Sequence, residues 1–142
     1  MKAVLLDLNI ILDYLFKRAG HGEAAKVIGL CAQKSMAGFV CAHEITTLSY
    51  FLNKALKVRN EVTKTLDRIL KMFQIIEINA EILNSALHSA VADFEDAVLE
   101  ASAQAKNINY IVTRNMKDFR KSSVSAITPE ELLAIHIESD VK

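Results

Sequence analysis

Short apolar runs alternate with amphipathic stretches along the chain, and this alternation is the main indication of its fold. Five runs are long enough to form strands, at residues 3–6, 37–41, 74–78, 110–112 and 124–127. Most of them are apolar at successive positions rather than at every second one, which is typical of parallel strands covered on both faces.

Residues with helical spacing fill the intervals between these runs. Within residues 62–73 the apolar side chains recur every three or four positions, while the charged ones fall on the opposite face. Similar stripes run through residues 45–56, 82–90 and 94–105, and Thr128-Pro129 is a typical start for a last helix. We expect residues 42–73 to form a helical hairpin broken near Lys57–Asn60. The alternation of strands and helices predicts an α/β fold, with a central, mostly parallel sheet of about five short strands flanked by helices.

Length and composition limit the class of protein further. The 142 residues predict a single domain, residues 1–142, that buries about two-thirds of its surface. Lys and Arg total 17, as do Asp and Glu, so the formal net charge is zero. This balance excludes a uniformly cationic nucleic-acid binder but leaves room for a local basic face. Cys31 and Cys41 lack CxxC spacing, and we expect both to be reduced residues of the core.

The apolar beginning of the chain does not have the features of a membrane or export segment. Asp7 and Asp13 interrupt it, and no small-residue cleavage site follows. No stretch reaches the roughly 20 apolar residues needed to span a bilayer. We therefore expect a cytoplasmic protein without a membrane partner.

Acidic and polar residues follow the predicted strands at the edge where parallel α/β sheets bind ligands. Asp7 and Asn9 follow the first strand, Glu44 follows the second, and residues 113–118 follow the fourth. Asp93 and Asp96 begin the helix that leads into the fourth strand. We therefore expect these side chains to lie along one edge of the sheet.

Most of these acids also have a purely structural explanation. Acids are favoured in the first turn of a helix, and the Asp93-x-x-Asp96 spacing is similar to a capping box. Asp7 differs, because an ionised carboxylate between two apolar segments is costly unless it is paired or bound to a metal. Converging carboxylates raise one another's pKa and favour a hard cation such as Mg²⁺ or Mn²⁺. The four histidines lack the spacing of zinc ligands.

Four segments in this order resemble the PIN domain family. They are LLDLNIILDYL at the start, the helix residue Glu44, DFEDAVLEASAQ and YIVTRNMKDF, and together they extend over nearly the whole chain. The resemblance implies a PIN-like fold and a metal-dependent ribonuclease that uses Mg²⁺ or Mn²⁺. It also implies an RNA substrate and, for a VapC-type toxin, a small antitoxin whose helices would block the groove near the acids.

The resemblance assigns roles residue by residue. It implies catalytic carboxylates at Asp7, Glu44, Asp96 and Asp118, of which Asp7, Asp96 and Asp118 would bind metal. Supporting positions are Asn9, Asp93, Thr113 and Asn115. Asn115 stands where the family usually has aspartate, and a subgroup that is similar in having T-R-N-x-x-D-F suggests that Asp118 supplies the missing carboxylate.

An acidic site repels RNA, so a ribonuclease also needs cationic side chains near the site. We expect Arg114 and Lys117 to contact substrate phosphate, and a structural ion pair is an equal expectation for Arg114. Further candidates are Arg120 and Lys121 after the fourth strand and Lys54, Lys57 and Arg59 on the hairpin. For the hairpin group, a solvated helix surface is the simpler interpretation.

Two questions stay open at the level of sequence. Asn115 allows a catalytically degenerate PIN-fold module that binds RNA or a protein without cleavage. The apolar residues Tyr14, Leu15 and Phe16 and those of the 62–73 stripe suit either a homodimer or ordinary core packing. Receiver domains, haloacid-dehalogenase-type phosphatases and dinucleotide-binding domains fit poorly, because the chain lacks their acidic pairs or glycine-rich turn.

Overall fold

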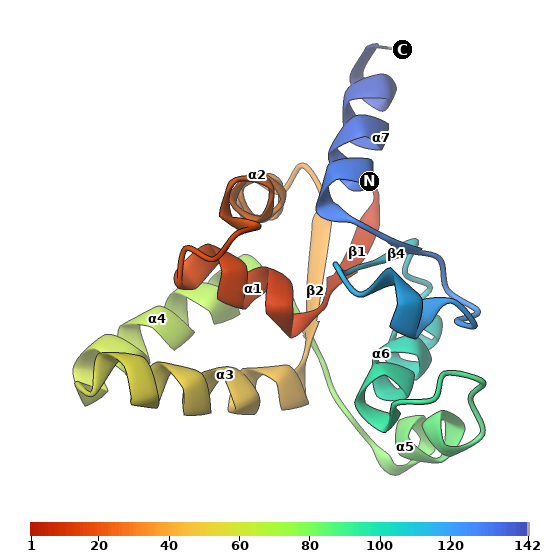
Figure 1. Cartoon of the computed structure of the whole chain (residues 1–142), viewed down its shortest axis with the longest axis horizontal. Helices are drawn as coiled ribbons and strands as arrows, with labels where there is room; N and C mark the ends of the chain where they lie inside the picture. The colour runs from red at the N-terminus through yellow and green to blue at the C-terminus, as the bar shows by residue number, and fades with distance from the viewer. Residues whose placement is uncertain (142) are drawn as a thin grey trace.

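A five-stranded sheet forms the centre of the molecule (Figure 1). The structure is a computed structural model that describes the backbone of residues 1–141 and the side chains of residues 1–137. The strands are β1 (Ala3–Leu6), β2 (Ala37–Cys41), β3 (Gln74–Ile76), β4 (Tyr110–Val112) and β5 (Ala126–Ile127). Their order is β3-β2-β1-β4-β5, and every neighbouring pair is parallel. The predicted α/β fold with a mostly parallel sheet is confirmed.

The two edge strands are shorter than the sequence suggests. The predicted runs 74–78 and 124–127 contribute only Gln74–Ile76 and Ala126–Ile127 to the sheet. An edge strand pairs on one side only, so fewer backbone hydrogen bonds hold its ends in extended geometry.

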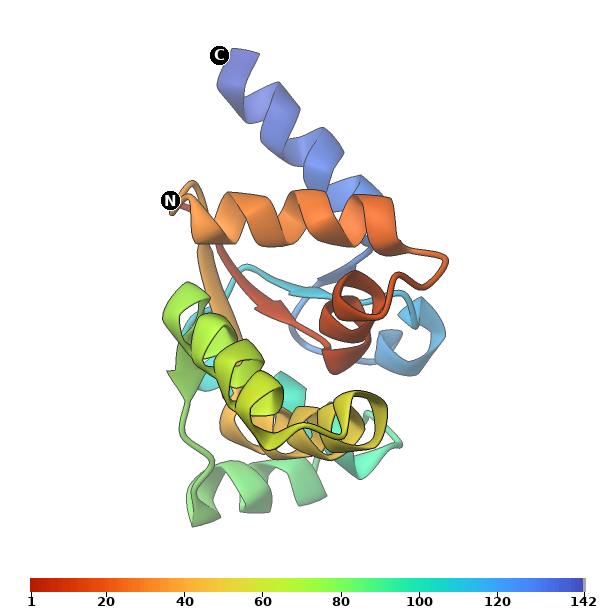
Figure 2. The same cartoon turned by 90° about the vertical axis from the view of Figure 1, so that its left-hand side faces the viewer.

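Helices cover both faces of the sheet (Figures 1 and 2). They are α1 (Leu8–Leu15), α2 (His21–Ala32), α3 (Ala42–Leu56), α4 (Arg59–Met72), α5 (Ala80–Leu87), α6 (Phe94–Ala105) and α7 (Pro129–Val141), with a 3₁₀ turn η1 at Met116–Phe119. Successive side chains of β1 point to opposite faces. Val4 and Leu6 pack in a core with α1, α2, α3, α4 and α7, whereas Leu5 packs in a second core with Leu99 of α6. The strands are buried on both sides, as their apolar sequences predict.

The predicted helical hairpin is confirmed as α3 and α4. Lys57 separates the two helices in the left-handed conformation, with φ of 57°. The break therefore falls inside the predicted interval Lys57–Asn60.

Close packing against one face of β2 requires a glycine at position 38. A Cβ atom at Gly38 would lie 2.6 Å from Sγ of Cys31 and 2.9 Å from Cδ1 of Phe73, so only glycine fits there. Cys31 and Cys41 are buried and free, as predicted. Burial raises the pKa of the Cys31 thiol to about 12, which makes this thiol unreactive at neutral pH.

In the described part of the chain, none of the helices is both long and apolar enough to cross a membrane.

Candidate active site

Asp7 lies at the carboxyl end of β1 and is held by β4. Its backbone N–H donates to the carbonyl of Val112 over 2.9 Å, which continues the sheet by one residue. Its Oδ2 accepts a 2.8 Å hydrogen bond from Oγ1 of Thr113, a fully buried residue. Asn9 contributes its backbone N–H, 3.5 Å from Oδ1. Burial raises the pKa of Asp7, while the bond from Thr113 and the nearby charge of Arg114 oppose the rise.

Glu44 lies in the first turn of α3, directly after β2. Its Oε1 accepts a 2.9 Å bond from the backbone N–H of Cys41, so it closes a capping box as an ordinary first-turn acid does. Its other oxygen, Oε2, is buried and has no hydrogen-bond partner. Burial raises the pKa of Glu44 well above its usual value, and the charge of Asp7 adds to the rise. Glu44 therefore serves as a cap and also presents a free acceptor in the interior.

Asp96 is the residue whose pKa is raised by the charges of several other acids. Asp93 caps α6, because its Oδ1 accepts from the backbone N–H of Asp96 over 3.1 Å. The half-buried Asp96 has a pKa of about 7, raised first by burial and then by the charges of Asp93, Asp7, Asp118 and Glu95. Such coupling requires these carboxylates to lie in one neighbourhood.

Asp118 and Asn115 differ in what they contribute to this group of acids, a charge from Asp118 and a backbone hydrogen bond from Asn115. Asp118 is exposed on η1, and its charge acts on Asp96 from there. Asn115 precedes η1, donates its backbone N–H to Oγ1 of Thr113 over 3.0 Å, and makes no side-chain cap bond. Asp118 is therefore the carboxylate that occupies the acidic neighbourhood after β4.

The cationic candidates divide into two groups. Arg114, Lys117, Arg120 and Lys121 are in or beside η1, close in sequence to Asp118. Lys54, Lys57 and Arg59 lie at the tip of the α3–α4 hairpin, at the left of Figure 1. At 1.5 Å per residue, α3 carries this tip roughly 20 Å from Glu44. The tip lysines and arginine are thus a solvated helix end, away from the acids.

Arg114 forms the structural ion pair that was one of its two expected roles. Its Nη2 donates to Oδ1 of Asp13 over 2.9 Å, and its Nε lies 2.6 Å from Oδ2 without the alignment of a hydrogen bond. Asp13 is completely buried, whereas the Arg114 side chain is 42% exposed. A Cβ atom at Gly20 would lie 2.8 Å from Oδ2 of Asp13, so glycine leaves room for the pair. This role of Asp13 was not predicted, although an acid within the apolar run of residues 10–16 is a usable signal.

The acids of the candidate site provide carboxylate oxygens, which are the ligands that a divalent cation such as Mg²⁺ prefers. Within the described residues, no group of three His, Cys, Asp or Glu side chains is close enough to hold one ion together. Mg²⁺, however, is commonly bound by one or two carboxylates and several waters rather than by a protein cage. Oε2 of Glu44 lacks a partner, and Asp96 becomes costly to ionise beside Asp7 and Asp118. The chemistry of these residues fits such a cation.

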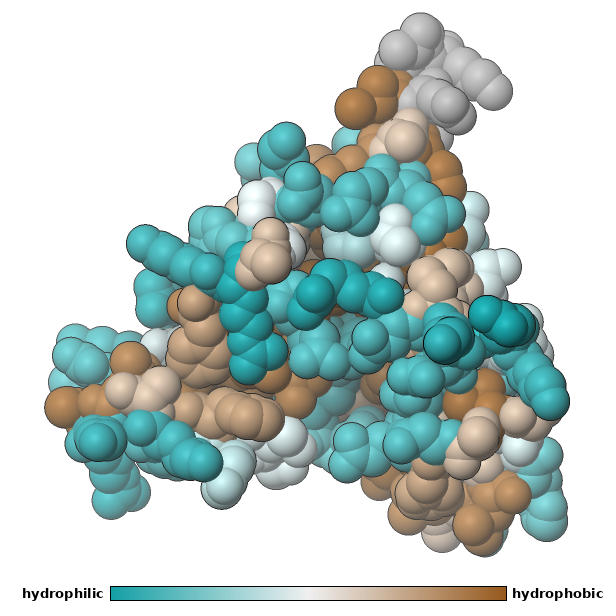
Figure 3. Space-filling model, in the orientation of Figure 1, coloured by the Kyte–Doolittle hydropathy of each residue, from teal (hydrophilic) through white to brown (hydrophobic). Residues whose placement is uncertain are grey.

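Helices α1, α3 and α6 begin near the middle of the view in Figure 1, and Asp7, Glu44 and Asp96 lie at these helix starts. The same region of the surface is mainly hydrophilic in Figure 3, between more hydrophobic areas over the hairpin tip and over α5.

Asp96 predicts a pH-dependent stability in the absence of divalent cations. Its carboxyl binds a proton more strongly in the fold, with a pKa of about 7, than in the unfolded chain, at 3.8. The folded state therefore holds more protons between these values, and the free energy of unfolding falls as the pH rises from about 4 to about 7. Asp96→Asn removes this titration, so in EDTA the Tm of the variant should gain on that of the wild type between about pH 5 and about pH 8. Glu81→Gln, at the exposed first turn of α5, should show a constant difference, and a constant difference for Asp96→Asn would contradict the raised pKa.

The Arg114–Asp13 pair predicts an asymmetric response to loss of charge. Arg114→Ala leaves the carboxylate of Asp13 buried and unpaired, which should lower the free energy of unfolding by about 3–5 kcal/mol in urea denaturation. Lys117→Ala, an exposed cation three residues away, should change it by less than about 0.5 kcal/mol. Equal effects of the two variants would mean that the pair does not stabilise the fold.

Comparison with known proteins agrees with this architecture. A family model described as the PIN domain matches residues 3–117. The comparison with curated sequences gives no match. Among solved structures, VapBC2 from Rickettsia felis, bound to a promoter DNA fragment, superposes with a TM-score of 0.70 at 20% identity, over 88% of this chain and 97% of that one. A toxin–antitoxin complex from Klebsiella pneumoniae gives 0.68 at 23% identity, over 89% and 98%.

A third structure, VapC20 from Mycobacterium tuberculosis, described as a sarcin-ricin loop cleaving toxin, gives a TM-score of 0.59 at 19% identity, over 77% of this chain and 87% of that one. At these identities the structures establish the fold, and the family model establishes the relationship. The strand order, the acids at the sheet edge and the match over residues 3–117 together show that this chain belongs to the PIN domain family.

Proposed function

We propose that the protein is a metal-dependent ribonuclease that hydrolyses RNA phosphodiester bonds. The observation that supports this most is the placement of Asp7, Asp93, Asp96 and Asp118 at the end of β1, the start of α6 and η1, where burial and the neighbouring carboxylates raise the pKa of Asp96 to about 7. In the described part of the chain, none of these four acids forms an ion pair with a basic side chain. A cluster of this kind is stabilised by a cation, and the cation in turn attracts phosphate.

Asp7, Asp96 and Asp118 are the residues that would hold Mg²⁺ or Mn²⁺, one or two of them directly and the others through bound water, with Oε2 of Glu44 as a further acceptor. A bound ion of this kind supplies positive charge for the phosphate and lowers the pKa of a water molecule. Thr113 fixes the direction of the Asp7 carboxylate through its 2.8 Å bond. Asp96 would lie beside that water, and a carboxylate in this place can accept the proton that the water loses.

Arg114 and Lys117 would bind the substrate's phosphates. Asp13 holds the guanidinium of Arg114 in one orientation, while 42% of the Arg114 side chain stays exposed. A cation fixed in this way loses less conformational entropy when it binds phosphate. Lys117 is exposed on η1 next to Asp118.

Cleavage of single-stranded RNA by the purified protein in Mg²⁺ or Mn²⁺ tests this function. EDTA should abolish cleavage, and Asp7→Asn, Asp96→Asn and Asp118→Asn should each reduce it more than about 100-fold, since even outer-shell partners of a metal contribute 10–100-fold. Asp67→Asn, an exposed acid paired with Lys71 on α4, is the control and should cleave normally.

Three outcomes would change the assignment. Cleavage that survives both Asp7→Asn and Asp96→Asn would point to a contaminating nuclease. Wild-type protein that binds RNA in Mn²⁺ without cutting it would favour the alternative, a degenerate PIN-fold module, and recovery of cleavage by Asn115→Asp would then identify Asn115 as the cause. If Asp118→Asn alone retained activity, Asp118 would not belong to the site.

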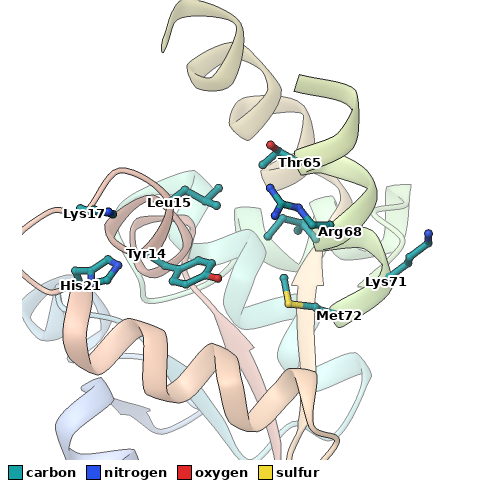
Figure 4. Close-up of a pocket in the computed structure, with 9 residues that line it drawn as sticks. Tyr14, Leu15, Lys17, His21, Thr65, Arg68, Lys71 and Met72 are labelled. Carbon is teal, nitrogen blue, oxygen red and sulfur yellow. The ribbon is translucent and has the colours of Figure 1, made fainter. Parts of the chain in front are cut away.

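We also propose that the protein is the toxin of a toxin–antitoxin pair, with a small protein as its partner. A groove of about 610 Å³ lies between α1, the start of α2 and α4 (Figure 4). Tyr14, Leu15, Ile69 and Met72 give it an apolar lining, and Lys17, Arg68 and Lys71 are the basic residues along it. This chemistry suits an amphipathic helix with acidic flanks. Of the structures with this fold, the one from K. pneumoniae is described as a toxin–antitoxin complex and the one from R. felis as VapBC2 bound to a promoter DNA fragment.

The groove lies at the end of α1 remote from Asp7, so a partner helix seated there would reach the acids only by extending along α1. Co-expression with the product of a short reading frame next to the gene tests this partner. The complex should be lost in Arg68→Glu/Lys71→Glu and retained in Lys117→Glu. If the protein alone forms a homodimer that Arg68→Glu/Lys71→Glu dissociates, the groove belongs to a second copy of this chain instead.

A further inference from the structure

Glu100 is a buried acid with a different environment from the acids of the candidate site. It lies on α6 one helical turn after Asp96 and is 6% exposed. Its Oε1 accepts a hydrogen bond from Oγ of Ser89, and its Oε2 accepts from the backbone N–H of Ser123 over 2.7 Å and from Oγ of Ser123 over 3.2 Å. Three donors on two oxygens satisfy the carboxylate without a cation.

The donors belong to two loops, one between α5 and α6 and one after η1. Ser89 lies in the loop between α5 and α6, and its Oγ also accepts from the backbone N–H of Val91 over 2.9 Å. This loop ends at Asp93, the cap of α6. Oε1 of Glu100 thus fixes the position of the segment that leads to Asp93.

Oε2 of Glu100 fixes the position of the segment that follows Asp118. Ser123 comes four residues after η1, and Ser122 links back to that turn by donating its N–H to the carbonyl of Phe119 over 3.0 Å. Phe119 is 3% exposed and packs in the same core as Leu99 of α6. A short 3₁₀ turn has few internal hydrogen bonds, so its position depends on such anchors.

We propose that Glu100 is a positioning residue, which fixes the segments carrying Asp93 and Asp118 against the helix that carries Asp96. The inference rests on the proposed ribonuclease and extends it to a residue outside the acidic cluster. A well-packed apolar residue would stabilise the fold at least as well as a buried carboxylate. The carboxylate contributes geometry instead, because its two oxygens hold two loops at a fixed separation.

Two substitutions of Glu100 and one matched control test this role. Glu100→Ala removes every link, whereas Glu100→Gln can still accept from the N–H of Ser123 and donate to Oγ of Ser89. Gln104→Ala is the control, because Gln104 is on the same helix and its Nε2 donates only to Oγ of Ser123. Glu100→Ala should lower kcat for RNA cleavage about 10- to 100-fold with little change in KM. Glu100→Gln and Gln104→Ala should stay near the wild type.

Mn²⁺ titration gives a readout that does not depend on activity. In the wild type, amide NMR signals around Asp96 and Asp118 should broaden together as Mn²⁺ is added. In Glu100→Ala the signals around Asp96 and Asp118 should both need about tenfold more Mn²⁺ than in the wild type, as expected when an outer-shell partner is lost. Ser89→Ala, which cuts one link only, is the second variant should Glu100→Ala fail to fold, and it should shift the signals around Asp93 in the same direction.

The results separate this inference from the proposed function. A wild-type protein that binds Mn²⁺ but cleaves no RNA would overturn the ribonuclease, and the Mn²⁺ profiles would still decide the role of Glu100. A folded Glu100→Ala protein with the wild-type kcat and Mn²⁺ profile would overturn the positioning role and leave Glu100 as a structural residue. Absence of Mn²⁺ binding in the wild type would overturn both.

Discussion

Repulsion among carboxylates at one edge of the sheet is the constraint on which the rest of the site depends. The parallel arrangement places the ends of β1, β2 and β4 side by side, and each is followed by polar or acidic residues. The result is visible in Asp96, whose pKa of about 7 reflects burial and the charges of Asp93, Asp7 and Asp118. A fold that gathers acids in this way is less stable for it, which is expected where the arrangement serves a function.

Separate devices hold the surrounding side chains in place. Thr113 orients Asp7, Cys41 fixes one oxygen of Glu44, and Asp93 caps the helix of Asp96. In each of these bonds the donor is a neutral O–H or N–H group rather than a cation. The one strong ion pair nearby, Arg114 with Asp13, is formed by an acid outside the cluster. The guanidinium is thus secured without neutralising the acidic edge.

Helix α1 joins the two surfaces of functional interest. It begins at the acidic edge, capped by Asp7, and ends at Tyr14 and Leu15 in the apolar groove of Figure 4. Between them, the buried Asp13 connects the same helix to Arg114 beyond β4. A partner that binds the groove therefore contacts an element that also carries part of the proposed site.

The sequence by itself determined the elements and the nature of the site. Apolar periodicity located all five strands and a hairpin break near Lys57–Asn60, because each strand or helix that packs on a core repeats its apolar residues with its own period. It also indicated Asp7 as an unusual acid, since a carboxylate between apolar segments is costly wherever they fold.

Only the tertiary structure decided which distant side chains meet. That the charge of Asp118 acts on Asp96, that Arg114 pairs with Asp13, that the hairpin cations lie far from the acids, and that Glu100 joins two loops all follow from strand order and loop packing. These contacts join residues up to about a hundred positions apart, a separation over which local pattern carries no information.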